Sequence, residues 1–465
     1  MVECGNQLHR CSACTTSLPL FFLFFLSSSL LFLLNRLARS WFSSISPPSV
    51  HSLPTASMPP SPDRMAQTSA LLLLPPPPSA SFPQFKDAYE PILSAVYSKL
   101  AQSLDGLNQS AILDIALSLP GLLSPECQPR ARMYGSLRRF LANIYRLIGI
   151  VSVERNIELG GPGGVDARVI FLDFDTVIHP SQATIPVSQT GPILDLETLA
   201  RSARLWDAVY YPDNAVGQTL ATAFSRIYCQ AKDPNAGAVE AISGVPNWTT
   251  AESLIVPGDA AKAVAHYSIA VGGTFDHFHI GHKQLLTATA LALDPVQDST
   301  SGRGGLLTIG VSGDELLVNK KYAEFLESWE ERCASSASFL MAIMDFCPPA
   351  SSAPRIEQIS QPGPNGKYTL MEIRRGLTLK LVQISDPFGP TITDESISAL
   401  VVSQETSSGG AAVNRERAKK GWKGLEVFEV DILHSGEVPS DDVDGFASKI
   451  SSTDLRRRRM ELAQR

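Results

Sequence analysis

The sequence has little charge, few aromatic residues and few cysteines for its length. Only 18% of its 465 residues are charged and 8% are aromatic. Of its 7 cysteines, three lie in the first fourteen residues and the others are widely scattered. This odd and scattered set does not form the framework of a secreted disulfide-rich domain, so we expect a reducing compartment. The 39 basic and 46 acidic residues give a net charge of −7. That balance argues against nucleic acid as a partner, because nucleic-acid-binding domains usually carry an excess of basic residues.

The sequence also lacks internal repeats, and its 44% hydrophobic content is that of an ordinary globular protein. A chain of this length is expected to hold two folded domains with appendages. Shifts in composition predict a leader over residues 1–80, an N-terminal α/β domain over 81–260 and a C-terminal domain over 261–465. The sequence carries no signal for the oligomeric state.

A long apolar run within the leader, residues 18–34, is followed by Arg36 and Arg39. The run is at the short limit for a membrane-spanning helix, and basic residues after it favour a cytoplasmic main body. A secretory signal would have its basic region before the run and a clear cleavage site after it, so secretion is disfavoured. Two interpretations stay open. The run is an N-terminal membrane anchor, or it is upstream sequence joined by an early start codon, since Met58 and Met65 both precede a Pro/Ser-rich stretch.

Three cysteines and one histidine in the first fourteen residues do not predict a zinc site, because a structural site needs four ligands on a folded turn. Residues 71–78, rich in proline, are interpreted as a stiff extended spacer. Beyond them, the spacing of apolar residues predicts helices over 85–103, 109–119, 134–150, 196–209 and 216–230, and a strand over 167–172.

The predicted strand ends in an Asp-x-Asp pattern, Asp173 and Asp175. This segment resembles the loose pattern of haloacid-dehalogenase-type phosphatases, in which such carboxylates supply the nucleophile and a magnesium ligand. The alternative is that the two residues only end a strand. The downstream lysine and acidic pair of that family have no clear counterpart before residue 257.

The strongest motif is GTFDHFHIGH at residues 273–282, which follows a short apolar strand and precedes a helical stretch. Gly272 and Gly273 allow a phosphate to approach the backbone closely. A helix that begins near Gly281 offers unpaired amides and the positive end of its dipole. The segment therefore predicts a polyphosphate site.

Residues 273–282 resemble the GTFDxxHxGH signature of the nucleotidylyltransferase superfamily at all its fixed positions. Residues 449–456 resemble the ISSTxxR motif of its adenylyl-transferring members, and the RTxGIST pattern of cytidylyl-transferring members is absent. Further matches to eukaryotic-type phosphopantetheine adenylyltransferases lie at residues 306–314, 319–321, 386–390, 401–406, 409–410 and 413–415. The resemblance covers about residues 265–465, with insertions at 294–305 and 348–366.

The resemblance implies a Rossmann-like, doubly wound parallel α/β sheet with its site at the carboxyl ends of the strands. The expected strands are 267–271, 306–312, 378–384, 398–403 and 425–432. We thus predict an α/β protein in which this sheet is preceded by a second α/β domain and a low-complexity leader.

The resemblance also implies the site residues. His279 and His282 would donate hydrogen bonds to nucleotide phosphates, with His282 nearest the α-phosphate, and either Lys320 or Lys321 would bridge the two substrates. Asp276 is expected to orient the turn. The remaining nucleotide- and phosphate-binding candidates are Gly273, Thr274, Phe275, Gly281, Ser451, Ser452, Thr453 and Arg456, and weaker candidates are Arg332, Asn414 and Arg415.

The implied reaction is adenylyl transfer from ATP to 4′-phosphopantetheine, giving dephospho-CoA and pyrophosphate in coenzyme A biosynthesis. Mg²⁺ is expected to travel with ATP, and no metal site made of protein ligands is implied. Alternatives are another nucleotidylyltransferase, acting on nicotinamide mononucleotide or a polyol phosphate, and the phosphatase on Asp173 and Asp175. The sequence has no GxxxxGK[ST] phosphate loop for a fused dephospho-CoA kinase, so we expect dephospho-CoA as the final product.

Overall fold

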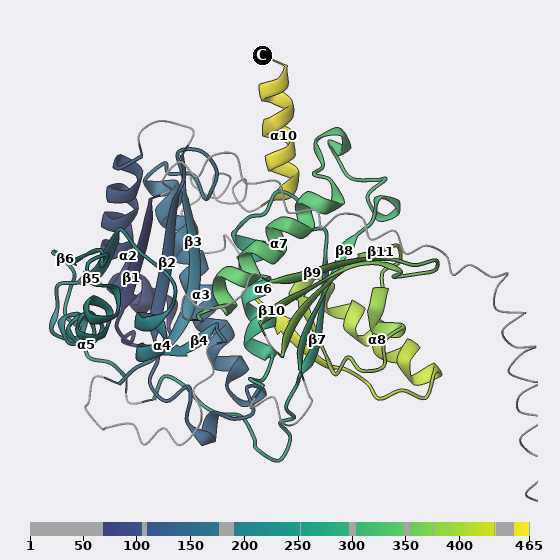
Figure 1. The fold of residues 1–465 in the computed structure, drawn as a ribbon, viewed down its shortest axis with the longest axis horizontal. Coiled ribbons are helices and arrows are strands. Elements are labelled where there is room, and N and C mark those ends of the chain that lie inside the picture. The colour runs from purple at the N-terminus through teal and green to yellow at the C-terminus, as the bar shows by residue number, and fades with distance from the viewer. Residues whose placement is uncertain are drawn as a thin grey trace, which may run out of the picture. The chain divides into compact units, whose positions relative to one another are not determined.

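The computed structural model describes residues 68–104, 109–175, 190–251, 253–296, 304–347, 354–374, 376–431, 433 and 451–464. Residues Ala66–Arg465 form one compact unit that contains two sheets (Figure 1). The apolar run at residues 18–34 and the cysteines before it lie outside the described residues. Within the described ranges, no helix is both long enough and apolar enough to cross a membrane.

The first sheet is parallel throughout, with strand order β4-β3-β2-β1-β5-β6. The chain runs from β1 through β2 and β3 to β4 and then returns to β5 on the other side of β1, which predicts helices on both faces of the sheet. The strands are β1 (Ser69–Leu74), β2 (Ala111–Ser118), β3 (Val165–Asp173), β4 (Ile193–Asp195), β5 (Ala208–Pro212) and β6 (Ala238–Ile242). The helices are α2 (Phe82–Gln102), α3 (Ala131–Glu154), α4 (Leu196–Arg201) and α5 (Ala215–Lys232).

Three predictions for this half were wrong. The start of the supposed spacer, Leu71 to Leu74, belongs to β1, and the supposed helix at 109–119 is β2. The helix predicted over 196–209 ends at Arg201, and the chain then enters β5. Strands buried on both faces are almost continuously apolar, so their residues show no alternation that would separate a strand from a short buried helix.

The second sheet is mixed, with strand order β13-β12-β7-β8-β11-β10-β9. The first five strands in this order are parallel, and β10 and β9 extend the sheet antiparallel. The strands are β7 (Ser268–Gly273), β8 (Gly305–Ser312), β9 (Arg355–Ser360), β10 (Lys367–Arg374), β11 (Leu377–Ile384), β12 (Ala399–Ser403) and β13 (Glu426–Val430). The helices are α6 (Ile280–Ala292), α7 (Trp329–Met344), α8 (Ser407–Lys419) and α10 (Ser452–Ala463).

The predicted fold class is confirmed: the protein is α/β, with a Rossmann-like sheet in its C-terminal half and a second α/β sheet before it. The predicted parallel strands form five of the seven strands of the C-terminal sheet, and the antiparallel pair β10 and β9 was not predicted. All five strands predicted for the C-terminal half are present. The expected insertion at 348–366 contains β9 and the turn that leads into β10. It therefore contributes a strand to the edge of the second sheet.

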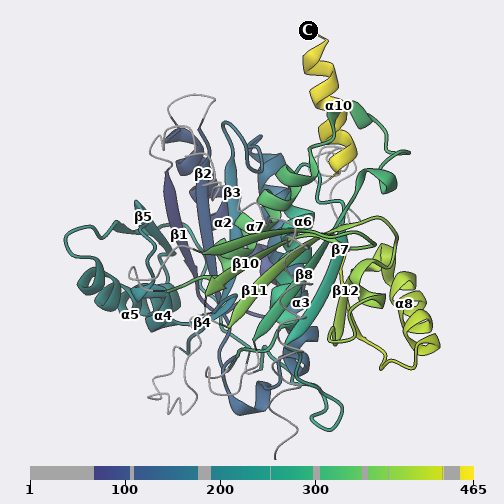
Figure 2. The same cartoon turned by 45° about the vertical axis from the view of Figure 1, so that its right-hand side comes forward.

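A shared apolar core joins the two halves of this unit. Buried side chains from both sheets form one continuous hydrophobic cluster. Helices α3 and α6 pack against each other between the sheets, as the turned view also shows (Figure 2). The first sheet is thus positioned to influence α6, the helix that follows the GTFDHFHIGH turn.

Candidate active site

The GTFDHFHIGH turn leaves the carboxyl end of β7 and enters α6 at Ile280. Phe275 and His277 have positive φ angles of 54° and 47°, so this segment is tightly folded. A Cβ atom at Gly273 would lie 2.9 Å from the Phe275 ring, which explains why glycine is required there. Such a backbone must be held by contacts from outside the turn.

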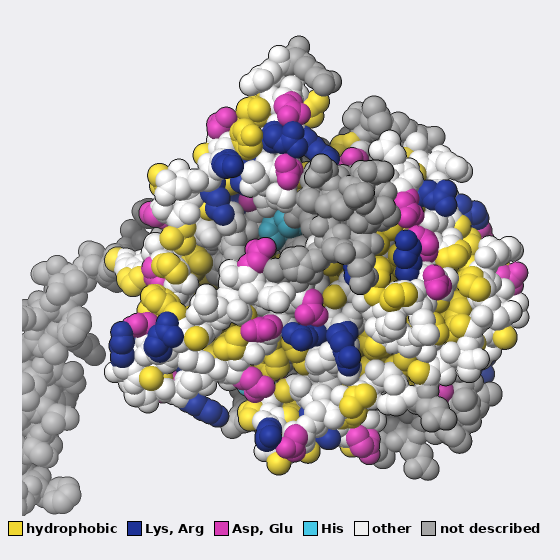
Figure 3. Space-filling view, turned by 180° about the vertical axis from the view of Figure 1, so that it is seen from behind, with side chains coloured by type: hydrophobic (Ala, Val, Ile, Leu, Met, Phe, Trp, Pro, Cys, Tyr) yellow, Lys and Arg dark blue, Asp and Glu magenta, His cyan; other side chains and the backbone are white. Residues whose placement is uncertain are grey.

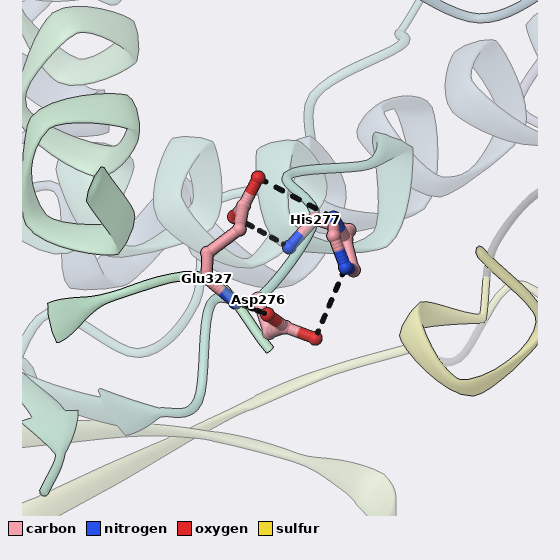
Figure 4. A group of neighbouring side chains, drawn as sticks. All are labelled: Asp276, His277 and Glu327. Carbon is pink, nitrogen blue, oxygen red and sulfur yellow. Dashed lines mark hydrogen bonds and ion pairs between the residues drawn. The ribbon is translucent and has the colours of Figure 1, made fainter. Parts of the chain in front are cut away.

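Glu327, just before α7, supplies one of these contacts (Figure 4). Its N–H donates to Asp276 Oδ1 at 2.9 Å, and its Oε2 accepts from the His277 N–H at 2.8 Å. His277 Nε2–H in turn donates to the Phe325 carbonyl at 2.8 Å. The polar atoms of Asp276, His277 and Glu327 lie within 4.8 Å of one another, a spacing that suits a metal ion. Because the carboxylates are already bonded to N–H donors, we interpret the group as a clasp on the turn.

Helix α10, from a distant part of the chain, also bonds Asp276 of this clasp. Arg456 is 1% exposed, and its guanidinium donates to the Asp276 carboxylate, to the Lys321 carbonyl at 2.9 Å and to Thr453 Oγ1 at 3.1 Å. Ser452 Oγ–H donates to the Asp276 carbonyl at 2.8 Å. The two segments that carry the sequence motifs are therefore in direct contact, although about 170 residues separate them.

His279 is the N-cap residue of α6, and its bonds define its tautomer. Its Nδ1 accepts a hydrogen bond from the Gly281 N–H at 3.2 Å, so the proton of the neutral ring is on Nε2. Nε2–H then donates to Ser452 Oγ at 3.2 Å. A Cβ atom at Gly281 would lie 3.1 Å from the imidazole, so a larger residue would push against this ring. The N-termini of α6 and α10 thus meet at the pair His279 and Ser452.

His282 stacks on His279, with ring centroids 3.9 Å apart and an interplanar angle of 22°. The rings of Phe275 and Phe278 lie 5.5 and 5.7 Å from it. His282 Nδ1 has no hydrogen-bond partner among the described residues. Figure 3 shows histidine surface at the bottom of a hollow, with acidic and basic side chains around its rim. An anionic ligand would supply the bonds that this imidazole lacks.

Arg332 ties the strand ends together beneath the turn. It is fully buried, and its NH1 donates to the carbonyls of Thr274 and Ser312, both at 2.9 Å. Its Nε–H donates to the Glu327 carbonyl at 3.1 Å, and burial lowers the pKa of its guanidinium. Since Thr274 and Ser312 follow or end the neighbouring strands β7 and β8, Arg332 sets the spacing of the strand ends that support the site.

Different known proteins are similar to different parts of the chain. A family described as a domain of unknown function (DUF8446) matches residues 58–247, which contain all six strands of the first sheet. A protein of Schizosaccharomyces pombe described as uncharacterized is 33% identical over 264 residues, 56% of this chain and 66% of that protein. The phosphopantetheine adenylyltransferase of Saccharomyces cerevisiae is 34% identical over 206 residues, 44% of this chain and 52% of that protein. The enzyme of that name from Pyrococcus abyssi is 28% identical over 167 residues, which are 36% of this chain and 80% of that protein.

The chain is thus homologous to these two phosphopantetheine adenylyltransferases, which are members of the nucleotidylyltransferase superfamily. These relatives carry the family name that the resemblance at residues 273–282 and 449–456 implied. The matched region spans only 66% and 52% of the first two relatives.

The structure brings most of the predicted nucleotidylyltransferase site residues together. Those that lie in the GTFDHFHIGH turn and the start of α6, or in the residues of α7 and α10 that contact them, are Thr274, Phe275, Asp276, His279, Gly281, His282, Arg332, Ser452, Thr453 and Arg456. Ser451 caps α10 by accepting from the Asp454 N–H at 3.4 Å. Lys320 and Lys321 are exposed in the loop after β8, and Lys321 joins the clasp through its carbonyl.

Two of the weaker candidates lie in α8, apart from the clasp. The Asn414 side chain bonds both the N–H and the carbonyl of Leu425, at 2.7 and 3.0 Å, which ties α8 to the segment before β13. Arg415 is exposed on the same helix. The contacts of Asn414 are those of a structural residue, so the geometry does not support a phosphate contact for it in this nucleotidylyltransferase fold.

The Asp-x-Asp pattern of the first sheet has a structural use. The Asp173 carboxylate accepts from the N–H groups of Gly121 and Leu123 at 2.7 and 2.8 Å, so it holds the loop after β2. Burial raises the pKa of this carboxyl group. With both oxygens bonded to backbone amides, Asp173 is not placed as a free nucleophile, and the geometry gives no support to the phosphatase alternative.

Sequence reasoning missed Glu327 and Lys283. Glu327 stands next to a recognisable helix start, because Ser328 and Glu331 form a capping box for α7. That signal predicts where the helix begins, but it does not predict the contacts of Glu327 with the distant turn. Lys283 directly follows His282 and begins the stretch of helical composition, with no further signal of its own.

The two site histidines predict how the stability of this nucleotidylyltransferase depends on pH. Burial lowers the pKa of His279 to about 3 and that of His282 well below 6.5. The unfolded chain therefore binds more protons than the folded chain below pH 6.5, so their contribution is fully present above that pH and is lost as the pH falls toward 3. Between pH 7 and pH 5 we expect a loss of up to about 2 kcal/mol per histidine in the free energy of unfolding, measured with urea.

The matched variant is His279→Asn, which keeps an N-cap side chain and removes one titrating ring. Its free energy of unfolding should fall by about 1–2 kcal/mol less over the same pH range. Most carboxylates titrate below pH 5 and interfere little in this window. An equal fall in both proteins would contradict the assignment.

Proposed function

We propose that the protein transfers the adenylyl group of ATP to 4′-phosphopantetheine, giving dephospho-CoA and pyrophosphate in coenzyme A biosynthesis. The observation that carries this proposal is the meeting of two helix N-termini, those of α6 and α10, at the pair His279 and Ser452. Each N-terminus offers unpaired amides and a positive dipole end. Together they suit a polyphosphate better than either helix would alone.

In the proposed reaction, a phosphate oxygen of phosphopantetheine attacks the α-phosphorus of ATP, and the bond to pyrophosphate breaks. No covalent bond to the protein is required, so catalysis depends on positioning and on stabilising charge. His282 would donate a hydrogen bond to the α-phosphate, where negative charge is distributed in the transition state. Ser452 and the first amides of α10 would hold the β- and γ-phosphates, and Lys320 or Lys321 would bridge the two substrates.

Mg²⁺ is expected to arrive with ATP, held largely by phosphate oxygens and water, and to neutralise part of their charge. The names of the relatives from Saccharomyces cerevisiae and Pyrococcus abyssi support the choice of acceptor. The ISSTxxR-like segment at the start of α10 supports ATP over CTP as donor. We expect the main body of the protein to act in the cytoplasm.

A substrate screen tests the proposal directly. The full chain is given ATP or CTP with 4′-phosphopantetheine, nicotinamide mononucleotide or glycerol 3-phosphate, and pyrophosphate release and product mass are measured. We expect ATP with 4′-phosphopantetheine to give dephospho-CoA, with a kcat/KM at least about a hundredfold above every other pair. A higher kcat/KM with another acceptor, or with CTP, would replace this assignment by another nucleotidylyltransferase.

A further inference from the structure

Helix α6 carries both site histidines at its N-terminal end, and the first sheet holds that end directly. Lys283, the residue after His282, is 4% exposed. Its ammonium group donates to the Asp166 carboxylate and, at 3.0 Å, to the carbonyl of Ala167, both on β3. The Lys283 side chain is 5% exposed and the Asp166 side chain 28%, and the ion pair with this additional hydrogen bond restricts the ammonium group to one position.

The C-terminal end of α6 is held from the same half of the unit. Arg130, at the start of α3, is 3% exposed, and its NH1 donates to the Leu293 carbonyl at 2.7 Å and the Ala290 carbonyl at 3.3 Å. Its N–H donates to Asp294 Oδ1 at 2.8 Å. A guanidinium at this point satisfies the last carbonyls of the helix and opposes the negative end of its dipole.

Four prolines lie where a ligand crevice of the first sheet would be expected. In its strand order the crevice is expected at the carboxyl ends of β1 and β5, where the strand order reverses. The chain leaves β1 through residues 75–78, four prolines, which have no N–H to offer to a phosphate. The Pro76 carbonyl accepts from Trp248 Nε1–H at 2.8 Å, and the Pro78 carbonyl accepts from the Ala251 N–H at 3.1 Å. The prolines and the segment over them thus occupy this place.

We propose that the region of residues 69–242 is a scaffold that positions α6, and that Asp166 is a positioning residue for the transfer reaction. The inference rests on the proposed function, and it gives a role to a domain whose family description states none. Asp166 touches no substrate. It acts by holding Lys283 and, through one peptide unit, the imidazole of His282 at the turn.

The test compares Asp166→Asn with Asp114→Asn in the full chain. Asp114 lies on the neighbouring strand β2 and is 3% exposed; its Oδ2 accepts from Arg204 and from Trp206, both at 2.9 Å. Both variants break an ion pair of the same sheet, in which the Asp166 side chain is 28% and the Asp114 side chain 4% exposed, and only Asp166 pairs with a residue of α6. We expect kcat for dephospho-CoA formation to fall about tenfold to a hundredfold in Asp166→Asn, with KM for ATP changed less than about threefold, because the change misplaces a group that acts in the transition state.

Asp114→Asn should keep kcat within about twofold while losing a similar amount of thermal stability. If Asp166→Asn also keeps kcat within twofold, the first sheet contributes stability only, and the proposal is wrong. Should Asp166→Asn fail to fold, the double variant Asp166→Asn/Lys283→Met removes the unpaired buried cation. Its kcat should still be at least about tenfold low, since methionine cannot bond the Ala167 carbonyl.

Hydrogen exchange separates this inference from the proposed reaction. Amides at the start of α6, residues 281–286, should exchange at least about tenfold faster in Asp166→Asn and at an unchanged rate in Asp114→Asn. This measurement needs no substrate. A wild-type protein that forms no dephospho-CoA but shows the exchange pattern would reject the proposed function and retain the scaffold. Unchanged exchange in Asp166→Asn would reject the scaffold whatever the substrate.

Discussion

Replacing His282 with alanine is expected to lower kcat for adenylyl transfer by about a hundredfold or more, with a smaller change in KM for ATP. The ring is placed at the meeting point of α6 and α10, stacked on His279, and its Nδ1 lacks a partner among the described residues. A hydrogen bond from this ring would strengthen as charge redistributes at the α-phosphate, so its loss affects the transition state more than the bound ground state. Steady-state kinetics with dephospho-CoA detection measures both constants.

His266→Gln is the matched control for this experiment. His266 is also a buried histidine, but it bonds Ser398 at 2.9 Å and Glu426 at 2.8 Å, between β7 and its neighbours. We expect this variant to lose thermal stability and to keep kcat within about twofold. If His282→Ala retains full activity, His282 has no part in the mechanism.

Replacing Arg456 with alanine is expected to lower kcat/KM for ATP by about a hundredfold or more, mainly through a higher KM. Arg456 holds the fully buried Asp276 carboxylate, and removing one member of a buried ion pair costs about 3–5 kcal/mol. Without it the N-terminus of α10 loses its anchor to the turn, so the contact between Ser452 and His279 is lost as well. Binding of the β- and γ-phosphates would suffer before the chemical step does.

Arg457→Ala serves as the control, because Arg457 lies on the same helix with an exposed side chain. Its partners are Asp454 and Glu461, both at 3.2 Å, and such exposed ion pairs contribute little to stability because solvent screens them. Kinetic constants within twofold of wild type are expected. A loss in Arg456→Ala no greater than that in Arg457→Ala would show that the clasp is not needed for ATP binding.

Helix and strand assignments succeeded where the pattern had a clear period or was bounded by turns. Helices α2, α3 and α5 showed the spacing of an amphipathic helix, and each was predicted within a few residues. The central strands β1 and β2 were missed, because they are buried on both faces and pair with partners far along the chain. The choice between a strand and a buried helix depended on those partners.

The site shows the same division. Local signals located the turn, the glycines and the N-cap of α6, because each requirement involves neighbours within a few residues. The contacts of Asp276 and Arg456 could not be predicted from the sequence. Asp276 was expected to orient the turn, which it does, but its partners Glu327 and Arg456 are 51 and 180 residues away.

By itself, the sequence indicated the resemblance to adenylyltransferases, the fold class of the C-terminal half and the two segments from which the site was predicted. A motif of this kind combines requirements for backbone conformation, helix capping and phosphate contact within ten residues, so it can be read without a structure. Only the tertiary structure decided which side chains are free to meet a ligand. It placed Arg456 in a clasp, Asp173 under a loop and Lys283 against the first sheet, because burial and ion pairing depend on surfaces that the folded chain brings together.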